Sequence, residues 1–92
     1  MRRAAKVDGN HTAIVSALRE AGASVLSLAA LGRGVPDLLV CGPDWCRLVG
    51  VKMPKGKPTP DQVRFSAAWG GPPVVTVRTV EDALAWLALF PL

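Results

Sequence analysis

A pair of short apolar segments joined by a turn lies in the middle of the chain and most constrains its fold. Residues 37–41 and 46–53 are typical of strands, and residues 42–45 between them begin with a glycine and a proline. Such residues favour a tight connection, because glycine frees the backbone and proline fixes it. The sequence therefore predicts a β-hairpin against which the other elements must pack.

Helix and strand signals lie on both sides of this hairpin. Asn10 is a favoured N-cap residue ahead of a helical apolar repeat, and Gly22 supplies a stop signal. A second helix starts after Thr59, because a proline follows at the first helical position and Gln62 can close a capping box. The predicted order is helix, strand, strand, strand, helix, strand and helix, over residues 11–21, 24–28, 37–41, 46–53, 60–69, 74–77 and 80–89.

Size and composition predict one α/β domain. The 92 residues are 50% apolar and 20% charged, which is a globular profile, and we expect residues 10–92 to form the domain behind a basic arm at residues 1–9. Eleven Lys and Arg against seven Asp and Glu give a net charge of +4, which makes nucleic acid the leading partner class. The apolar stretches are too short to span a bilayer, so we expect a cytoplasmic protein without a membrane partner.

The two cysteines, Cys41 and Cys46, do not form a metal-site spacing with the single histidine, His11. In a reducing cytoplasm two cysteines are most simply small buried apolar residues, which is the interpretation that we adopt. Because they flank the predicted turn, they are also placed to face each other across the hairpin and to oxidise in vitro.

The last predicted helix is apolar on every side over residues 83–90. A helix on the surface of a small monomer normally shows one apolar stripe, so the sheet accounts for only one face of this helix. We expect the other face to pair with a second copy of the chain, which gives a homodimer. The alternative is an unusually apolar C-terminal segment.

Two candidate catalytic residues lie in the hairpin strands. Pro36 belongs at the start of a strand, which places the carboxylate of Asp37 at the strand tip. Alternate residues of the next strand share a face, so Gly50 and Lys52 point to the same side of the sheet. If Asp37 also points there, a carboxylate and an ammonium group converge. Taken singly, Asp37 is as well explained by a turn or by pairing with Arg33, and Lys52 by protection of a sheet edge.

An ordered set of short motifs runs through nearly the whole chain. It comprises Asp8-x-Asn10, Ile14-Val15-x-x-Leu18-Arg19, Ala21-Gly22-Ala23-x-Val25, Gly32-x-Gly34-x-Pro36-Asp37-Leu38-Leu39-Val40 and Thr59-Pro60-Asp61-Gln62-x-x-Phe65-x-x-x-Trp69. With this set the chain resembles the PD-(D/E)XK nuclease superfamily, and within it the small phage-type domain of the virus-type replication-repair nucleases (VRR-NUC). The resemblance implies a restriction-endonuclease-like core of a helix, a three-strand meander, a helix and a strand, followed by an apolar C-terminal helix.

The resemblance also implies metal-dependent hydrolysis of phosphodiester bonds in DNA. Asp37 would then bind Mg²⁺ or Mn²⁺ together with the backbone carbonyl of Val51, since such ions prefer oxygen ligands. Lys52 would position the attacking water or help to deprotonate it, and would counter charge on the phosphate. Gln62 matches a glutamine near the family's site, although closing the capping box at Thr59 explains it equally well.

Position 50 departs from the family's pattern, because the family carries an acid two residues before the lysine and this chain has Gly50. An engineered glutamate-to-glycine change, a natural loss of activity, or an acid from elsewhere would explain it, and the intact Asp37 and Lys52 favour the first. Losing such an electrostatic stabiliser costs on the order of 10²–10³ in rate, so we expect a weak or inactive nuclease that still binds DNA. Candidates for a migrated acid, each otherwise a solvated surface charge, are Asp8, Glu20 and Asp61.

Basic and aromatic residues suggest how DNA would be held. Six basic residues of the arm and loops are our candidates for phosphate contacts, with simple surface solubility as the alternative for each: Arg2, Arg3, Lys6, Arg33, Lys55 and Lys57. We expect Trp45 to pack in the hairpin turn, and Trp69 and Trp86 to be core or interface residues.

Three hypotheses for the function follow. The leading one is a homodimeric endonuclease for structured or branched DNA such as four-way junctions, in the cytoplasm of a bacterium or of a phage-infected cell. The second is a non-catalytic DNA-binding module, in which the basic surface is the whole function. The third is a small assembly protein whose charge is incidental.

Overall fold

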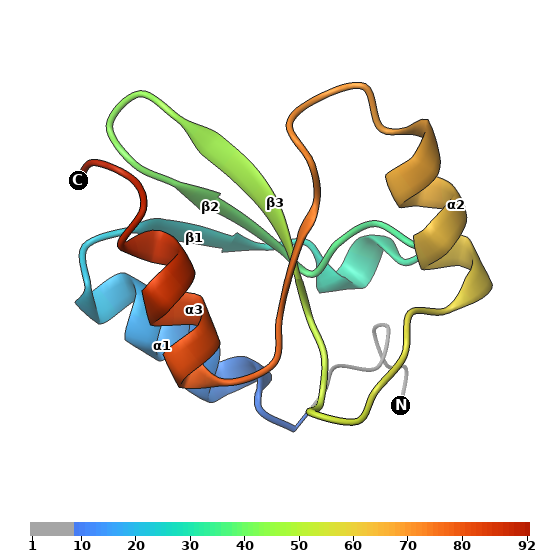
Figure 1. The fold of residues 1–92 in the computed structure, drawn as a ribbon, viewed down its shortest axis with the longest axis horizontal. Coiled ribbons are helices and arrows are strands. Elements are labelled where there is room, and N and C mark those ends of the chain that lie inside the picture. The colour runs from blue at the N-terminus through green and yellow to red at the C-terminus, as the bar shows by residue number, and fades with distance from the viewer. Residues whose placement is uncertain (1–8) are drawn as a thin grey trace.

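The central hairpin forms where the sequence predicts it. In the computed structural model, which describes residues 9–92, β2 (Leu38–Cys41) pairs antiparallel with β3 (Cys46–Val51). β1 (Ser24–Ser27) pairs antiparallel with β2, and β4 (Val75–Val77) pairs parallel with β3. The result is a four-stranded mixed sheet in the order β1-β2-β3-β4 (Figure 1).

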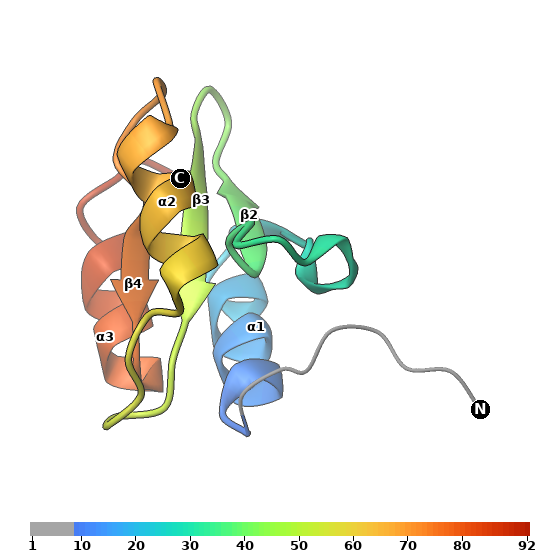
Figure 2. The ribbon, with the colours of Figure 1, turned by 90° about the vertical axis from the view of Figure 1, so that its right-hand side faces the viewer.

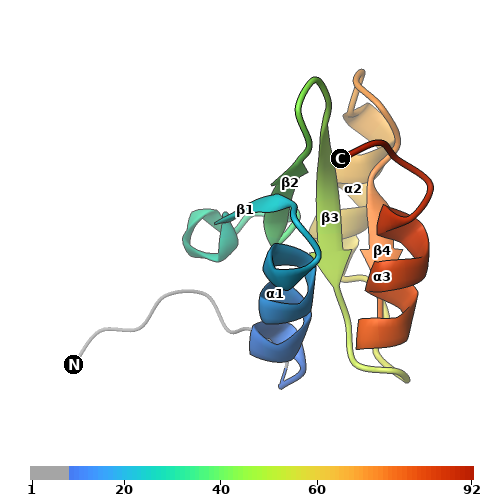
Figure 3. The ribbon, with the colours of Figure 1, turned by 90° about the vertical axis from the view of Figure 1, so that its left-hand side faces the viewer.

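Helices cover both faces of this sheet. α1 (His11–Glu20) and α3 (Val80–Leu87) lie side by side on one face, and α2 (Pro60–Ala68) lies on the opposite face (Figure 2 and Figure 3). The order of helices and strands is the predicted one. The structure adds a short 3-10 helix, η1 (Ala29–Leu31), where the end of the preceding strand was uncertain from the sequence.

The core of the described chain lies on one face of the sheet. It is built from α1, α3 and the alternate strand positions that point toward these two helices, as helical and two-residue periodicities require. Its buried residues are Ile14, Leu18, Ala23, Leu38, Val40, Val49, Val51, Val77, Ala83 and Leu87. α2 contributes none of them, since every residue of that helix is at least partly exposed.

Side-chain caps fix the starts of α2 and α3. The hydroxyl of Thr59 accepts a hydrogen bond from the backbone N–H of Gln62 at 3.2 Å, and Gln62 Oε1 accepts one from the backbone N–H of Thr59 at 2.9 Å. This confirms the predicted capping box. At α3, the Thr79 hydroxyl accepts a hydrogen bond from the backbone N–H of Asp82 at 3.0 Å.

Asn10 occupies the N-cap position of α1 as predicted, but its side chain makes no cap hydrogen bond. Its Nδ2 instead donates to the carbonyl oxygen of Lys52 at 3.0 Å and to that of Arg78 at 2.5 Å. These two acceptors follow β3 and β4, which are parallel and therefore end side by side. The amide thus ties the start of α1 to the ends of two strands.

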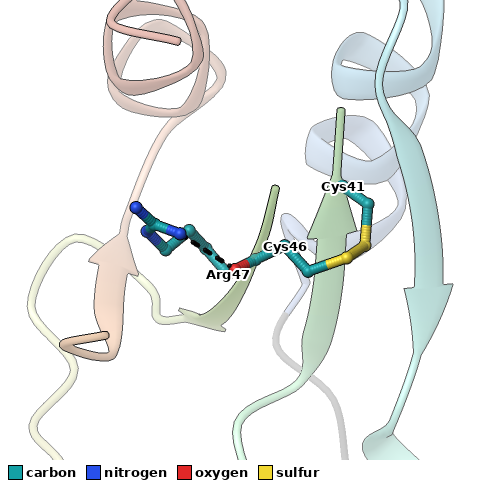
Figure 4. Close-up of a disulfide and its surroundings, with 3 residues drawn as sticks. All are labelled: Cys41, Cys46 and Arg47. Carbon is teal, nitrogen blue, oxygen red and sulfur yellow. Dashed lines mark hydrogen bonds between the residues drawn. A yellow bond between two sulfur atoms is a disulfide. The ribbon is translucent and has the colours of Figure 1, made fainter. Parts of the chain in front are cut away.

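The expectation that Cys41 and Cys46 are two buried free thiols is wrong. They lie opposite each other in the β2–β3 pairing and form a disulfide with an S–S distance of 2.03 Å (Figure 4). Cys46 is exposed and Cys41 is half-buried, because alternation turns both away from the core face. The alternative of pairing across the hairpin is therefore the arrangement that the structure shows.

The three tryptophans divide into two environments. Trp45 packs in the turn as expected, with its ring 4.7 Å from that of Phe90 and 6.1 Å from that of Trp86, and its Nε1 donates to the Pro91 carbonyl at 2.8 Å. Trp69 stacks on Phe65 at 5.4 Å and remains 42% exposed, so it is not a core residue, and the alternative of an interface residue stays a prediction.

The predicted basic arm at residues 1–9 lies, except for Gly9, outside the described residues. Within residues 9–92, no helix combines the length and the apolar character needed to cross a membrane.

Candidate functional site

Asp37 and the backbone around Gly50 meet at the edge where β2 begins. Asp37 Oδ2 accepts a hydrogen bond from the backbone N–H of Val51 at 2.7 Å. The same oxygen lies 4.0 Å from the point that a Cβ on Gly50 would occupy. Since Leu38 pairs with Val49, residue 37 falls opposite residue 50 when the register is extended by one position.

A cavity of about 230 Å³ lies between the sheet and α2. Gly50 and Lys52 line it from β3 and its continuation, as their shared strand face predicts. Thr76 of β4 and Gln62 and Ser66 of α2 contribute further polar side chains. The structure therefore brings together three residues that the sequence singled out, namely Gly50, Lys52 and Gln62, and places Asp37 directly beside the first.

Gly34 allows α2 to approach the sheet closely. Its φ is +80°, a backbone conformation that residues other than glycine rarely adopt. A Cβ at this position would collide with the backbone carbonyl of Asp61 and lie 2.8 Å from the backbone nitrogen of Gln62. Glycine is thus required here by both conformation and space, and it sets one wall of the cavity.

Gly50 has no comparable structural reason to be glycine. Its φ is not among the positive values in the described chain. A Cβ there would meet only the Val75 carbonyl at 3.8 Å, and Asp37 Oδ2 and Thr76 Oγ1 at 4.0 Å, which are ordinary van der Waals distances. The backbone at position 50 therefore accepts a larger side chain.

The location of Gln62 is compatible with both roles considered for it from the sequence, the capping box and the candidate site. Its Oε1 is engaged in the capping box with Thr59, and the residue also lines the cavity. Because an amide carries two separate polar ends, Nε2 remains to donate toward a ligand. The two interpretations of Gln62 are therefore compatible in geometry.

The oxygen ligands of this site do not fit Mg²⁺ or Mn²⁺ in the chain as given. Asp37 provides the carboxylate nearest to Gly50, and one of its oxygens is committed to the Val51 amide. The backbone carbonyl of Val51, the other ligand that the resemblance implies, would add only one neutral oxygen. Across residues 9–92, no group of three or more His, Cys, Asp or Glu is arranged to hold a metal ion. Such ions prefer several hard oxygen ligands, and the described residues of this site offer fewer than they need.

The candidate migrated acids do not fill this gap. Glu20 is exposed at the end of α1, which covers the other face of the sheet. Asp61 is exposed and pairs with Arg64 one helical turn away. Asp8 lies outside the described residues. Neither described acid is among the residues that line the cavity.

The basic residues expected to contact DNA fall into two groups. Arg33, Lys55 and Lys57 are exposed loop residues, and the first and last of them directly precede the cavity-lining residues Gly34 and Pro58. The remaining three lie outside the described residues: Arg2, Arg3 and Lys6.

Arg78 holds the loop that carries Lys55, and its sequence position gave no signal of this role. Its Nη1 donates to the carbonyl oxygens of Gly56 at 2.7 Å and of Met53 at 3.0 Å. Arg78 directly follows β4, and parallel pairing with β3 brings it to the start of this loop. The contact of Arg78 with this loop could have been predicted only if the parallel pairing of β3 with β4 had been known.

Comparison with known proteins adds no family to these observations, because no protein-family model and no curated protein matches the chain. The resemblance to VRR-NUC domains remains a hypothesis that depends on the motif set and on the geometry around position 50.

Proposed function

We propose that this chain is a PD-(D/E)XK nuclease domain of the VRR-NUC type whose site lacks the acid at position 50. The observation that carries the proposal is the unobstructed space beside Gly50, where the Cβ of a side chain would lie 4.0 Å from Asp37 Oδ2. Lys52 lines the same cavity two residues further along. An acid at position 50 would therefore stand between a carboxylate and an ammonium group, as the acid-x-lysine motif requires.

The proposed roles of the present residues follow from their contacts. The Val51 N–H holds the carboxylate of Asp37 in one orientation, and Lys52 brings positive charge to the cavity. Arg33, Lys55 and Lys57 would hold phosphates of structured or branched DNA, together with the arm residues Arg2, Arg3 and Lys6. Without a second acid, the chain should bind DNA but cleave it weakly or not at all, in a bacterial or phage-infected cytoplasm.

Restoring the acid tests the proposal directly. Gly50→Glu should cleave a four-way junction, in Mg²⁺ or Mn²⁺, at least about 10²-fold faster than the chain as given. Gly50→Gln is the matched control, since it fills the same space without a charge, and Asp37→Asn combined with Gly50→Glu should abolish the gain. Duplex and single-stranded substrates report the preferred DNA structure. Equal rates for Gly50→Glu and Gly50→Gln would contradict the assignment as a nuclease.

A non-catalytic DNA-binding module is the second candidate, and the glycine at position 50 itself favours it. In that case all variants at position 50 would be inactive, yet would bind DNA with an affinity that falls steeply as salt is raised. If the chain does not bind DNA even at low salt, an assembly protein would be favoured instead. Titrations of a labelled junction at two salt concentrations separate these cases.

We also propose that the chain forms a homodimer through its C-terminal segment. Leu84, Leu89 and Leu92 are 38%, 77% and 53% exposed, although the neighbouring Ala83 and Leu87 are buried against the core. Apolar groups exposed together commonly mark an interface. Sedimentation should show a dimer that Leu89→Glu dissociates, whereas the control Leu26→Glu, at an exposed position of β1, should not.

A further inference from the structure

The cavity beside Gly50 is lined by hydrogen-bond donors. Its polar side chains are those of Lys52, Gln62, Ser66 and Thr76, and each carries an N–H or O–H group. The Oε1 of Gln62 is already engaged by the Thr59 amide, which leaves its Nε2 as the free end. The carboxylate of Asp37 is not among the lining groups. The cavity is therefore suited to an acceptor with negative charge.

The rest of the lining is apolar. Pro36, Pro58, Val63 and Val74 complete the walls. The volume of about 230 Å³ is far above the roughly 10–15 Å³ that a single water molecule needs, so the cavity has room for a ligand of several heavy atoms. Such a space suits a ligand that has one polar end and a short hydrocarbon chain, because polar groups without partners are costly against apolar walls.

We propose that this cavity binds a small aliphatic carboxylate of about the size of butyrate. The carboxylate lies beside Lys52, in the space that a side chain at position 50 would fill, and the hydrocarbon chain lies against Val63 and Val74. A more highly charged oxyanion fits less well, because Asp37 Oδ2 lies 4.0 Å from the start of that space and repels a second negative charge more strongly than a single one. This cavity is also the one at which the proposed nuclease site lies, but binding of the carboxylate needs neither DNA nor metal and therefore does not rest on the proposed function.

The expected result is a saturable and local response to butyrate. In titrations followed by two-dimensional NMR at constant ionic strength, the backbone amides of Gly50, Lys52 and Thr76 should shift with a dissociation constant of about 1–10 mM. Butylamine and inorganic phosphate, added as probes of charge sign and of oxyanion type, should bind at least about tenfold more weakly.

Two variants tie the response to the cavity. Lys52→Met should weaken butyrate binding at least about tenfold, because it removes the charged donor and keeps the length of the side chain. Gly50→Glu should abolish the shifts, because its own carboxylate occupies the space. The dispersion of the remaining amide signals shows that each variant is folded. Butyrate shifts that fail to saturate, that survive Gly50→Glu, or that phosphate reproduces with equal affinity would overturn the proposal.

Discussion

The two faces of the sheet differ in how tightly they are covered. On one face, α1 and α3 bury Ile14, Leu18, Ala83 and Leu87 against the strands. On the other face, α2 buries none of its residues and leaves Val63 56% exposed. The candidate site, the cavity and the disulfide all belong to this second face or its edge.

This difference separates stability from function within a small chain. The α1/α3 face contains the close-packed core, where a change of one side chain alters packing directly. The α2 face has room for a ligand because α2 approaches the sheet closely at Gly34 but buries none of its own residues against it. Substitutions in a site on the loosely covered face should therefore lower the free energy of unfolding only slightly.

The largest difference should appear when one apolar side chain is truncated to alanine on each face. Leu18→Ala removes a fully buried side chain from α1 and should lower the free energy of unfolding by about 2–5 kcal/mol. Val63→Ala on α2 should lower it by less than about 1 kcal/mol. Urea denaturation followed by circular dichroism measures both values. Similar losses for the two variants would show that the faces are equally important for stability.

The disulfide should stabilise the loosely covered face by an intermediate amount. Its two cysteines are five residues apart in sequence, so it closes a short loop. The entropy of a closed loop this short corresponds to about 2 kcal/mol, which is the loss expected for Cys41→Ser combined with Cys46→Ser. Reduction of the unchanged chain should give the same loss in urea denaturation. If reduction has no effect on the midpoint, the hairpin is held by its ladder and the Trp45 cluster alone.

Local signals in the sequence predicted most of the elements. The capping box at Thr59 and the glycine after residue 21 lie within one turn of the helix ends that they mark. The apolar segments predicted the strands and their order, because strand periodicity is also local. Such features depend on neighbouring residues and are therefore readable from a single sequence.

Contacts between distant segments were not readable in this way. Asn10 stands at the N-cap position of α1, yet its side-chain oxygen makes no cap hydrogen bond, while its Nδ2 donates to carbonyl oxygens 42 and 68 residues away. Arg78 binds the loop after β3 only because β3 and β4 are parallel. The disulfide is a local contact that the sequence offered only as an alternative, and the register of β2 with β3 decides in its favour.

The candidate site was predicted in part. Strand alternation predicted that Gly50 and Lys52 share a face, and the cavity that both line agrees with this. The sequence did not show that Asp37 would hydrogen-bond to the Val51 amide, nor that α2 would leave a cavity. The hydrogen bond depends on the register of β2 with β3, and the cavity depends on how closely α2 approaches the sheet at Gly34, which lies outside the strands.

Removing a helix cap should affect the two faces in different ways. Thr59→Ala and Thr79→Ala each delete one hydroxyl that accepts a backbone N–H at a helix start, at a cost of about 1 kcal/mol. Thr79→Ala should lower the global stability, because α3 is part of the core. Thr59→Ala should mainly speed hydrogen exchange of the α2 amides, since that helix can open locally. Equal protection losses in both helices would show that α2 unfolds only with the whole domain.

The smallest effect on stability is expected at position 50, although the largest effect on activity is proposed there. Gly50→Ala should raise the free energy of unfolding by about 0.5–1 kcal/mol, because glycine weakens a strand interior and the added methyl group meets no close atom. Gly50→Glu should remain within about 1 kcal/mol of the chain as given, since repulsion from Asp37 offsets the same backbone gain. Urea denaturation at neutral pH measures both. A loss of more than about 1 kcal/mol for Gly50→Ala would show that the fold itself requires glycine at this position, and a missing acid would then no longer be needed to explain it.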